Sequence, residues 1–156
     1  MAFENVYGYE SIKRKLLKLK GWYDKRNEYV SRGVELPRGL LLYGEAGCGK
    51  SLIAGEFARF IDHNPVVIAS KKDLAKQFEL AKKESKEKGI VKAVMIDELD
   101  LIVDDDSDAV RILQSEIDGF SKECRVFPIA TANNIDSIPD SLQRSGRFDY
   151  RLNIGY

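Results

Sequence analysis

Cysteine, histidine, net charge and long apolar runs are scarce or missing in this sequence of 156 residues. Two cysteines and one histidine supply neither a disulfide framework nor a spaced set of metal ligands, so we expect a reducing, cytoplasmic compartment. The 25 basic and 25 acidic residues leave no net charge, which indicates no direct attraction to nucleic acid or to an anionic membrane. No apolar run approaches the ~20 residues that span a bilayer, and the first residues lack the pattern of a secretory signal.

What is present is typical of one folded domain, which we expect to cover residues 1–156. Apolar residues make up 44% of the chain, enough at this length to bury a core without a disulfide or a metal. Short apolar runs predict strands, and the amphipathic stretches between them predict helices. The expected strands are 39–43, 66–69, 91–96 and 126–131, and the expected helices are 50–61, 71–88 and 107–118, after an opening helix in two pieces at about 10–20 and 23–32. Strands that alternate with helices favour a parallel sheet, so the predicted fold class is α/β.

A glycine-rich run after the first core strand has the spacing of a phosphate-binding loop. The run is Gly44-Glu45-Ala46-Gly47-Cys48-Gly49-Lys50-Ser51, which fits G-x-x-x-x-G-K-[ST]. Glycines let the backbone wrap closely around an anion, and N–H groups of the loop and the next helix point at it. In such a loop Lys50 contacts the β- and γ-phosphates and Ser51 ligates Mg²⁺. A chance glycine turn is the alternative, but the strand before the motif and the helix after it favour the phosphate loop.

Two acids follow the apolar run 91–96 directly. Ligands of α/β sheets bind beyond the carboxyl ends of the strands, where Asp97 and Glu98 would emerge. Asp97 is suited to hold Mg²⁺ and Glu98 to act as general base towards an attacking water. The alternative is a pair of solvated acids that open a loop, continued by Asp100 and by the acids of 104–106. The segment 104–108 is expected to be an exposed loop that ends in an N-cap at Ser107 or Asp108.

Polar residues also follow the strand expected at 126–131. Asn133 or Asn134 could orient the attacking water, or could simply cap a loop. Further along, Arg144 and Arg147 flank a Ser-Gly pair. Planar guanidinium groups suit the charge of a phosphoryl transition state, although surface ion pairs or another bound anion would use the same residues.

Taken in order, the motifs GEAGCGKS, AVMIDELD, ILQSEIDGF and ATANNIDSIPDSLQRSGRFD resemble a known family. The chain resembles the AAA ATPases (ATPases associated with diverse cellular activities), in the subgroup that carries the second region of homology. The patterns of that subgroup are GPPGTGKT, hhhhDE, LLxxLDGF and ATNRPDxLDPALxRPGRFD. The opening FENVYGYESIKRKL is similar to the family's FxDVxGxxxxKxxL, so the resemblance covers nearly the whole chain.

The resemblance implies a fold, two cofactors and a role for each matched residue. The fold is a three-layer αβα P-loop NTPase sandwich with a five-stranded parallel sheet of order 5-1-4-3-2, the family's large α/β nucleotide-binding subdomain. The cofactors are ATP and Mg²⁺. Lys50 contacts the phosphates, while Ser51 and Asp97 ligate Mg²⁺. Glu98 is then the general base, and Asn133, rather than Asn134, matches the sensor-1 asparagine.

The same resemblance implies contacts beyond this core set. Arg144 and Arg147 match arginine fingers that act on the nucleotide of a neighbouring subunit. A finger of this kind contributes ~10³–10⁵ in rate in related GTPases, so an isolated subunit is expected to be slow. The expected nucleotide contacts of the entry segment and the phosphate loop are Asn5, Tyr7, Gly8, Glu45, Ala46, Gly47, Cys48, Gly49, Lys50, Ser51 and Leu52.

Three departures from the family pattern bear on function. Glu45-Ala46 replaces Pro-Pro in the phosphate loop, which places an acid beside the phosphate site. Ser70–Lys76 leads almost directly into a helix without the family's aromatic-Gly pore loop, which argues against threading of a polypeptide through a central pore. The sequence also stops where the large subdomain of the family ends, so the small helical lid with its sensor-2 arginine is expected to be absent.

The leading functional hypothesis is a Mg²⁺-dependent ATPase whose hydrolysis drives remodelling of a protein substrate. Its partners would be ATP and ADP, further copies of the chain or other AAA subunits in a ring such as a hexamer, and a protein substrate of unknown identity. The alternative is a nucleotide-binding oligomerisation module with little turnover. A small-molecule kinase is disfavoured because Glu98 is better suited to activate water than to serve an acceptor pocket.

Overall fold

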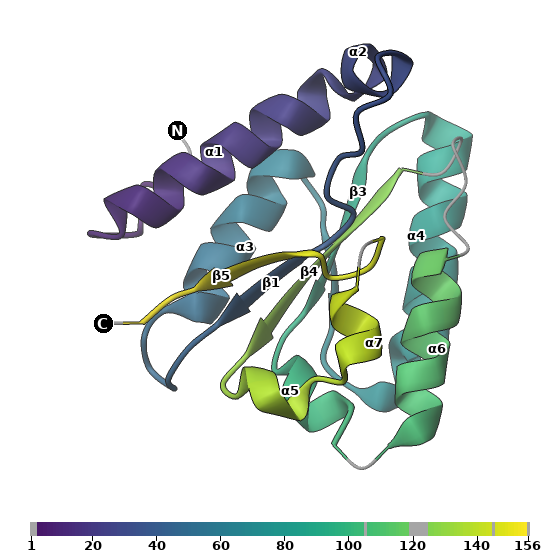
Figure 1. Ribbon diagram of the computed structural model, residues 1–156. Helices are drawn as coiled ribbons and strands as arrows, with labels where there is room; N and C mark the ends of the chain where they lie inside the picture. The colour runs from purple at the N-terminus through teal and green to yellow at the C-terminus, as the bar shows by residue number, and fades with distance from the viewer. Residues whose placement is uncertain (1–2, 105, 119–124, 145, 156) are drawn as a thin grey trace.

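The computed structural model describes residues 3–104, 106–118, 125–144 and 146–155, and its centre is a five-stranded sheet with helices on both faces (Figure 1). The strands are β1 (Leu40–Tyr43), β2 (Val66–Ile68), β3 (Lys92–Ile96), β4 (Val126–Ala132) and β5 (Tyr150–Asn153). Their order is β2-β3-β4-β1-β5, and every neighbouring pair is parallel. This order is the predicted 5-1-4-3-2 counted from the other edge, so the predicted fold class is confirmed.

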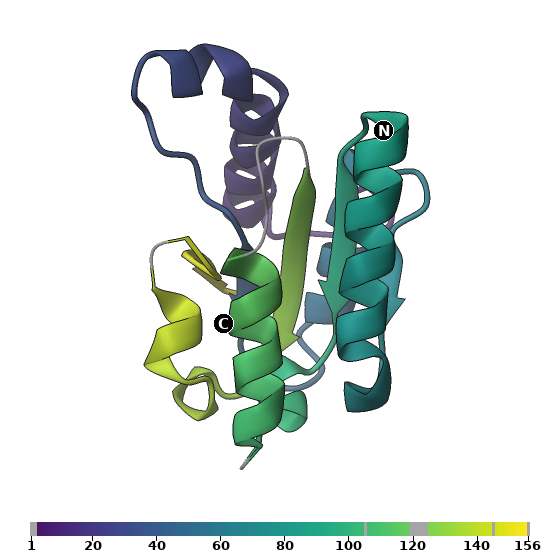
Figure 2. The same ribbon diagram turned by 90° about the vertical axis from the view of Figure 1, so that its right-hand side faces the viewer.

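The helices form the two outer layers (Figures 1 and 2). Because successive side chains of a strand point to opposite faces, β1 contributes to two apolar clusters. Leu40 and Leu42 pack with the helices α1 and α3, and Leu41 packs with the helices on the other face. The α-helices are α1 (Glu10–Asp24), α2 (Arg26–Ser31), α3 (Lys50–Ile61), α4 (Leu74–Lys88), α5 (Leu99–Ile102), α6 (Ser107–Asp118) and α7 (Asp140–Gln143). In the part of the chain that is described, no helix has the length and apolar character needed to cross a membrane.

The opening helix is longer than predicted. The sequence predicts a break near residues 20–23, but α1 continues to Asp24 and the break falls at Lys25. Gly21 lowers helix propensity by about 1 kcal/mol, and one such residue is tolerated inside a packed helix. The ion pair of Lys20 with Asp24, at 2.6 Å, spans one turn and adds support across the glycine.

One other helix start and one N-cap also differ from the prediction. The stretch predicted as one helix from residue 71 begins as a 3₁₀ turn, Lys71–Asp73, and α4 starts only at Leu74. The N-cap of α6 is Asp106 rather than the predicted Ser107 or Asp108, because the backbone N–H of Ala109 donates to Asp106 Oδ1 at 3.0 Å. An N-cap side chain accepts from the third helical residue, so α6 begins at Ser107, as predicted, and only its N-cap differs.

The parallel sheet brings three segments to one edge. The segments 44–49, 97–98 and 133–134 follow β1, β3 and β4, which are adjacent in the sheet. Since these strands run in the same direction, their carboxyl ends meet at that edge, where the motif residues lie. Some residues named above, Gly119 and Phe120 of ILQSEIDGF and Ser145 between the two arginines, lie outside the described residues.

Candidate functional site

The loop 44–49 turns from the end of β1 into the first turn of α3. Gly47 and Gly49 have φ angles of 82° and 90°, the left-handed region that side chains rarely adopt. Apart from the adjoining residues, no atom of the described part of the chain lies within 4 Å of a Cβ added at either glycine, so the backbone conformation rather than lack of space requires glycine there. The N–H groups of the first turn of α3, which begins at Lys50, face this loop without helical partners. Such an arrangement suits an anion.

The Lys50 ammonium lies inside the loop and not in solvent. The residue is only 6% exposed, and its Nζ donates to the carbonyl oxygens of Gly44 and Glu45, both at 2.7 Å. Its Nζ also lies 3.7 Å from the Sγ of Cys48. No carboxylate of the described chain pairs with this charge. The loop therefore concentrates one positive charge together with the N–H groups that face it.

A hydroxyl–carboxylate cluster joins this loop to the two neighbouring strands. Ser51 Oγ donates to Asp97 Oδ1 at 2.7 Å, so the two predicted Mg²⁺ ligands are in direct contact. Thr131 of β4 donates to the same oxygen at 2.5 Å and accepts the backbone N–H of Glu98 at 2.9 Å. Thr131 was not predicted as a site residue. Only the β3–β4 register, which pairs Ile96 with Ala130, identifies it as the neighbour of Asp97.

Glu98 has a strained backbone. Its φ and ψ are both 54°, the left-handed conformation, which costs a non-glycine residue about 1 kcal/mol or more. Its carbonyl oxygen accepts the N–H groups of Leu101 and Ile102 and so starts α5. The side chain is exposed at the carboxyl edge of the sheet. The chain thus turns sharply at Glu98 and presents its carboxylate beside Asp97.

The two asparagines after β4 have different roles. Asn134 Oδ1 accepts the N–H of Asp136 and caps a 3₁₀ turn, Ile135–Ser137. Asn133 is exposed, and within the described residues no hydrogen bond holds its side-chain amide. Asn134 is therefore the loop-capping residue of the two alternatives, and Asn133 is the one whose amide can reach a ligand.

A buried acid holds this turn in place. Asp100 Oδ2 accepts the backbone N–H groups of both Asn133 and Asn134, each at 3.2 Å. The residue is 6% exposed, and its other oxygen has no partner in the described part of the chain. Asp100 follows Glu98 by two residues, so the segment after β3 fixes the segment after β4. Sequence reasoning treated Asp100 only as one more loop acid.

The two arginines lie at the opposite end of β1 from the loop. Arg147 precedes β5, whose first residue pairs with Leu40 at the start of β1, whereas the loop follows the end of β1. Arg147 donates from Nε and Nη2 to the two carboxylate oxygens of Asp118, at 3.1 and 2.8 Å, and from Nη1 to the carbonyl oxygen of Ser141. These hydrogen bonds lower the pKa of Asp118 and raise that of Arg147. Arg144 is exposed.

The entry segment packs beside the loop. Tyr9 donates its hydroxyl to the carbonyl oxygen of Cys48 at 2.6 Å, and the Asn5 amide donates to Glu56 of α3 at 3.2 Å. The hydrogen bond from Asn5 is the largest of the effects that lower the pKa of Glu56. Tyr7 is 90% exposed, and Gly8 beside it has a φ of 78°. Of the nucleotide contacts predicted in the entry segment, Asn5, Tyr7 and Gly8, Tyr7 is the one with an exposed aromatic ring.

A model of the family described as "ATPase family associated with various cellular activities (AAA)" matches residues 40–156. The chain belongs to the AAA family. Curated AAA relatives include the ATP-dependent zinc metalloprotease FtsH of Ureaplasma parvum, 26% identical over 99% of this chain and 23% of that protein. Proteins of the same name from Cyanidium caldarium and Karelsulcia muelleri are each 30% identical over 99% of this chain and 28% of their own length. The chain therefore spans about a quarter of the length of these relatives.

The AAA relatives also carry residues that this chain lacks. The three alignments extend over 173 to 180 residues, more than the 156 of this chain. One short connection is visible in the fold, because only Ala69 and Ser70 separate β2 from the 3₁₀ turn before α4. The predicted direct passage from this strand into the next helical segment is confirmed.

The AAA fold brings together most of the residues that were predicted to act together. Lys50 and Ser51 adjoin the acids after β3, and Asn133 directly follows the neighbouring strand β4. The arginines stay apart from this cluster within one chain. Among the described residues, no group of three or more His, Cys, Asp or Glu could hold a metal ion by itself.

Proposed function

We propose that this AAA domain binds ATP with Mg²⁺ and hydrolyses its terminal phosphate at the carboxyl edge of the sheet. One observation carries the proposal: the hydroxyl of Ser51, directly after the glycine loop, lies 2.7 Å from the Asp97 carboxylate, directly after a buried strand. Residues 46 positions apart supply two hard oxygen ligands at one point, next to a loop whose N–H groups and ammonium attract phosphate. A chance glycine turn does not account for that contact.

The donor set fits Mg²⁺ bound together with a nucleotide. Mg²⁺ prefers oxygen ligands and is usually held by one or two protein groups, with phosphate oxygens and waters completing the octahedron. Ser51 and Asp97 supply a hydroxyl and a carboxylate, so the scarcity of further acids is expected for such a site. The bound ion would supply charge neutralisation on the phosphate oxygens.

The remaining residues act by position and charge. Lys50 would exchange its two carbonyl partners for phosphate oxygens, which are stronger acceptors because they carry charge. Glu98 would accept a proton from the attacking water, and Asn133 would orient that water with its unengaged amide. Asp100 accepts the backbone N–H of Asn133 and so fixes the position of Asn133 relative to the segment that carries Glu98.

Assembly is the second part of the proposal. Arg144 and Arg147 lie at the far end of β1, so they cannot serve the phosphate loop of their own chain and would act on that of a neighbour. Arg147 first has to leave Asp118, or Arg144 alone serves as the finger. The proposed assembly is a ring of identical or related AAA subunits that remodels a protein. The competing function is a nucleotide-binding oligomerisation module, which the short β2–α4 connection favours.

The test is the ATP hydrolysis rate per subunit of the 156-residue chain, measured against protein concentration with Mg²⁺ and saturating ATP. A rate per subunit that rises with concentration supports hydrolysis with arginines supplied between subunits. Nucleotide binding with a rate of zero at every concentration supports the oligomerisation module instead. If the chain binds neither ATP nor ADP in the presence of Mg²⁺, the proposed function is wrong.

A further inference from the structure

We propose that Thr131 is a positioning residue that sets the Mg²⁺ carboxylate and the general base with a single hydroxyl. The inference rests on the proposed function and adds a residue to its machinery. Asp97 and Glu98 are consecutive, but the group of Asp97 that matters is its carboxylate, whereas the direction of the Glu98 side chain is set by its backbone N–H and the backbone conformation. Thr131 contacts both of these groups.

The Thr131 hydroxyl makes one hydrogen bond to each of these two residues. It donates its one proton to Asp97 Oδ1 at 2.5 Å and accepts the N–H of Glu98 at 2.9 Å. Thr131 is 1% exposed, so water does not compete for either hydrogen bond. Its place is fixed by the sheet, because β3 and β4 pair up to Ile96 and Ala130, the residues just before Asp97 and Thr131.

The first consequence concerns the Asp97 carboxylate. Its Oδ1 receives two hydroxyl donors, Ser51 from the phosphate loop and Thr131 from β4. Two donors from different segments on one oxygen restrict rotation of the carboxylate. Oδ2 has no hydrogen bond to the described residues, and it is the oxygen left to face a metal-bound water. Without Thr131, Ser51 alone would orient this group.

The second consequence concerns Glu98. Left-handed backbone conformations persist in residues other than glycine only where the surroundings hold them. At Glu98 the carbonyl oxygen is held by α5 and the N–H by Thr131. Loss of the hydroxyl would leave the Glu98 N–H without this partner and remove one of the two constraints on the left-handed backbone, so that the Glu98 carboxylate could turn away.

The family pattern does not contain this residue. In the pattern ATN a threonine directly precedes the asparagine, and here Ala132 stands at that position while Thr131 lies one residue earlier. Since adjacent strand residues point to opposite faces of a sheet, a threonine one place later could not make the same contacts. The assignment of Thr131 therefore comes from its contacts in this fold.

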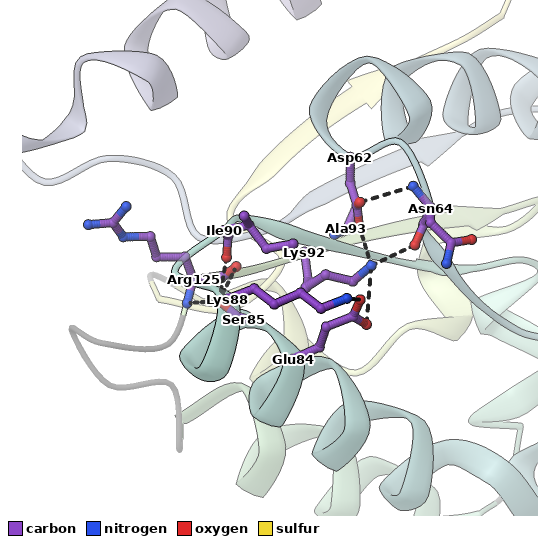
Figure 3. A network of polar contacts seen from close by, with 9 residues as sticks. All are labelled: Asp62, Asn64, Glu84, Ser85, Lys88, Ile90, Lys92, Ala93 and Arg125. Atoms are coloured by element: carbon purple, nitrogen blue, oxygen red, sulfur yellow. Dashed lines mark hydrogen bonds and ion pairs between the residues drawn. The ribbon is translucent and has the colours of Figure 1, made fainter.

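A matched control lies at the other end of the sheet (Figure 3). The Ser85 hydroxyl is fully buried, donates to the carbonyl oxygen of Ile90 at 2.6 Å and accepts the N–H of Arg125 at 2.8 Å. Ser85 thus bridges two segments with one hydroxyl, as Thr131 does, but far from the phosphate loop. Removal of either hydroxyl is expected to lower the melting temperature, so stability alone does not separate a structural role from a positioning role.

The separating measurement is calorimetric titration with a non-hydrolysable ATP analogue, with Mg²⁺ and with EDTA. Loss of an interaction that orients a metal ligand typically weakens metal affinity 10–100-fold. We therefore expect Thr131→Val to lose about 10-fold or more of the Mg²⁺-dependent gain in affinity while its affinity in EDTA stays at the wild-type value. Thr131→Ser should keep the gain, and Ser85→Ala should keep it too. Thr131→Ala serves in place of Thr131→Val if the valine variant does not fold.

Two outcomes contradict the inference in different ways. If the hydroxyl-deleted Thr131 variant keeps the same Mg²⁺-dependent gain as Ser85→Ala, Thr131 has only a structural role and the proposed function is unaffected. If the wild-type chain binds the analogue neither with Mg²⁺ nor with EDTA, the proposed function itself fails, and the inference fails with it.

Discussion

Charged residues stand at the start of the strand β3 and directly after its end, and they differ in whether they form ion pairs. At its start, Lys92 is 1% exposed and pairs with Asp62 at 2.9 Å and with Glu84 at 3.5 Å (Figure 3). After its end, Asp97 and Glu98 have no ion pair with any lysine or arginine of the described residues, and their partners are hydroxyl and backbone groups. At the start of β3 the charge of Lys92 is neutralised within the chain, whereas after its end the charges of Asp97 and Glu98 are not.

We call the start of β3, with Lys92, Asp62 and Glu84, the closed end, and the segment after β3, with Asp97 and Glu98, the open end. At the closed end the polar groups of Asp62 and Lys92 have partners within the chain. Asp62 accepts from the backbone of Asn64 and of Ala93 as well as from Lys92, and Lys92 also donates to the carbonyl oxygen of Asn64. Burial alone would raise the pKa of Asp62, but the hydrogen bonds from Lys92, Ala93 and Asn64 together lower it. At β3, residue type therefore does not separate a structural charge from a charge of the proposed site. What separates them at this strand is whether the chain itself supplies the opposite charge.

The largest expected effect is at the open end. Glu98→Gln removes the proposed base but keeps the size of the side chain, and loss of a general base typically lowers turnover by 10²–10⁴-fold. We expect a loss of about that size in the ATP hydrolysis rate, with ATP affinity and melting temperature unchanged. The matched variant at the closed end is Glu84→Gln, which should hydrolyse ATP at the wild-type rate. Equal rates for Glu98→Gln and the wild type would remove Glu98 from the mechanism.

The next largest effect is at the closed end and concerns stability. Lys92→Met leaves Asp62 buried without its cation, and removal of one partner of a buried ion pair costs about 3–5 kcal/mol. Chemical denaturation should show that loss in the free energy of unfolding. The control is Lys83→Met on the exposed side of α4, which should change stability by less than about 0.5 kcal/mol. A loss as small as that of the control would mean that the pair contributes no net stability.

Much of the fold, and those residues of the candidate site that stand in sequence motifs, could be predicted from the sequence, because both depend on local patterns. The strands β1 to β4 read as apolar runs, whereas β5, with the sequence YRLN, does not and was not predicted from its residues. Lys50, Ser51, Asp97 and Glu98 stand in motifs whose spacing is set by a strand followed by a turn. The strand run 91–96 was recognised although it contains a lysine. Why that lysine is tolerated could not be predicted, because its partners come from the end of α3 and from α4.

The supporting residues were missed for the same reason. Thr131 and Asp100 act across the β3–β4 pair, and their roles depend on register and on which backbone N–H groups face them. No spacing rule within one segment contains that information. The arginines are a third case, because the sequence predicts their chemistry but not the ion pair that holds Arg147 to Asp118.

The pH dependence of the closed end follows from the lowered pKa of Asp62. A carboxyl group whose pKa is lower in the folded than in the unfolded state stabilises the fold above its unfolded pKa, and that contribution is lost as the pH falls through the folded pKa. We expect the stability difference between the wild type and Asp62→Asn to be constant near neutral pH and to shrink below about pH 4, the ordinary range of aspartate. Urea unfolding at a series of pH values measures it. A difference that grows in acid would reverse the assigned direction.

The smallest effect tests whether the open end carries a conformational cost. Glu98→Gly removes the clash of Cβ in the left-handed conformation, worth about 1–2 kcal/mol, and adds the chain entropy of glycine, which costs about 0.5–1 kcal/mol. The two nearly cancel, so the unfolding free energy should stay level or rise slightly. The same change inside a helix, Glu79→Gly in α4, has no such relief and should lower stability by about 1 kcal/mol. A matching loss at Glu98 would mean that no strain is stored there. A level or higher stability would mean that relief of the left-handed conformation offsets the entropy of glycine, so that strain is stored at Glu98 in the wild type.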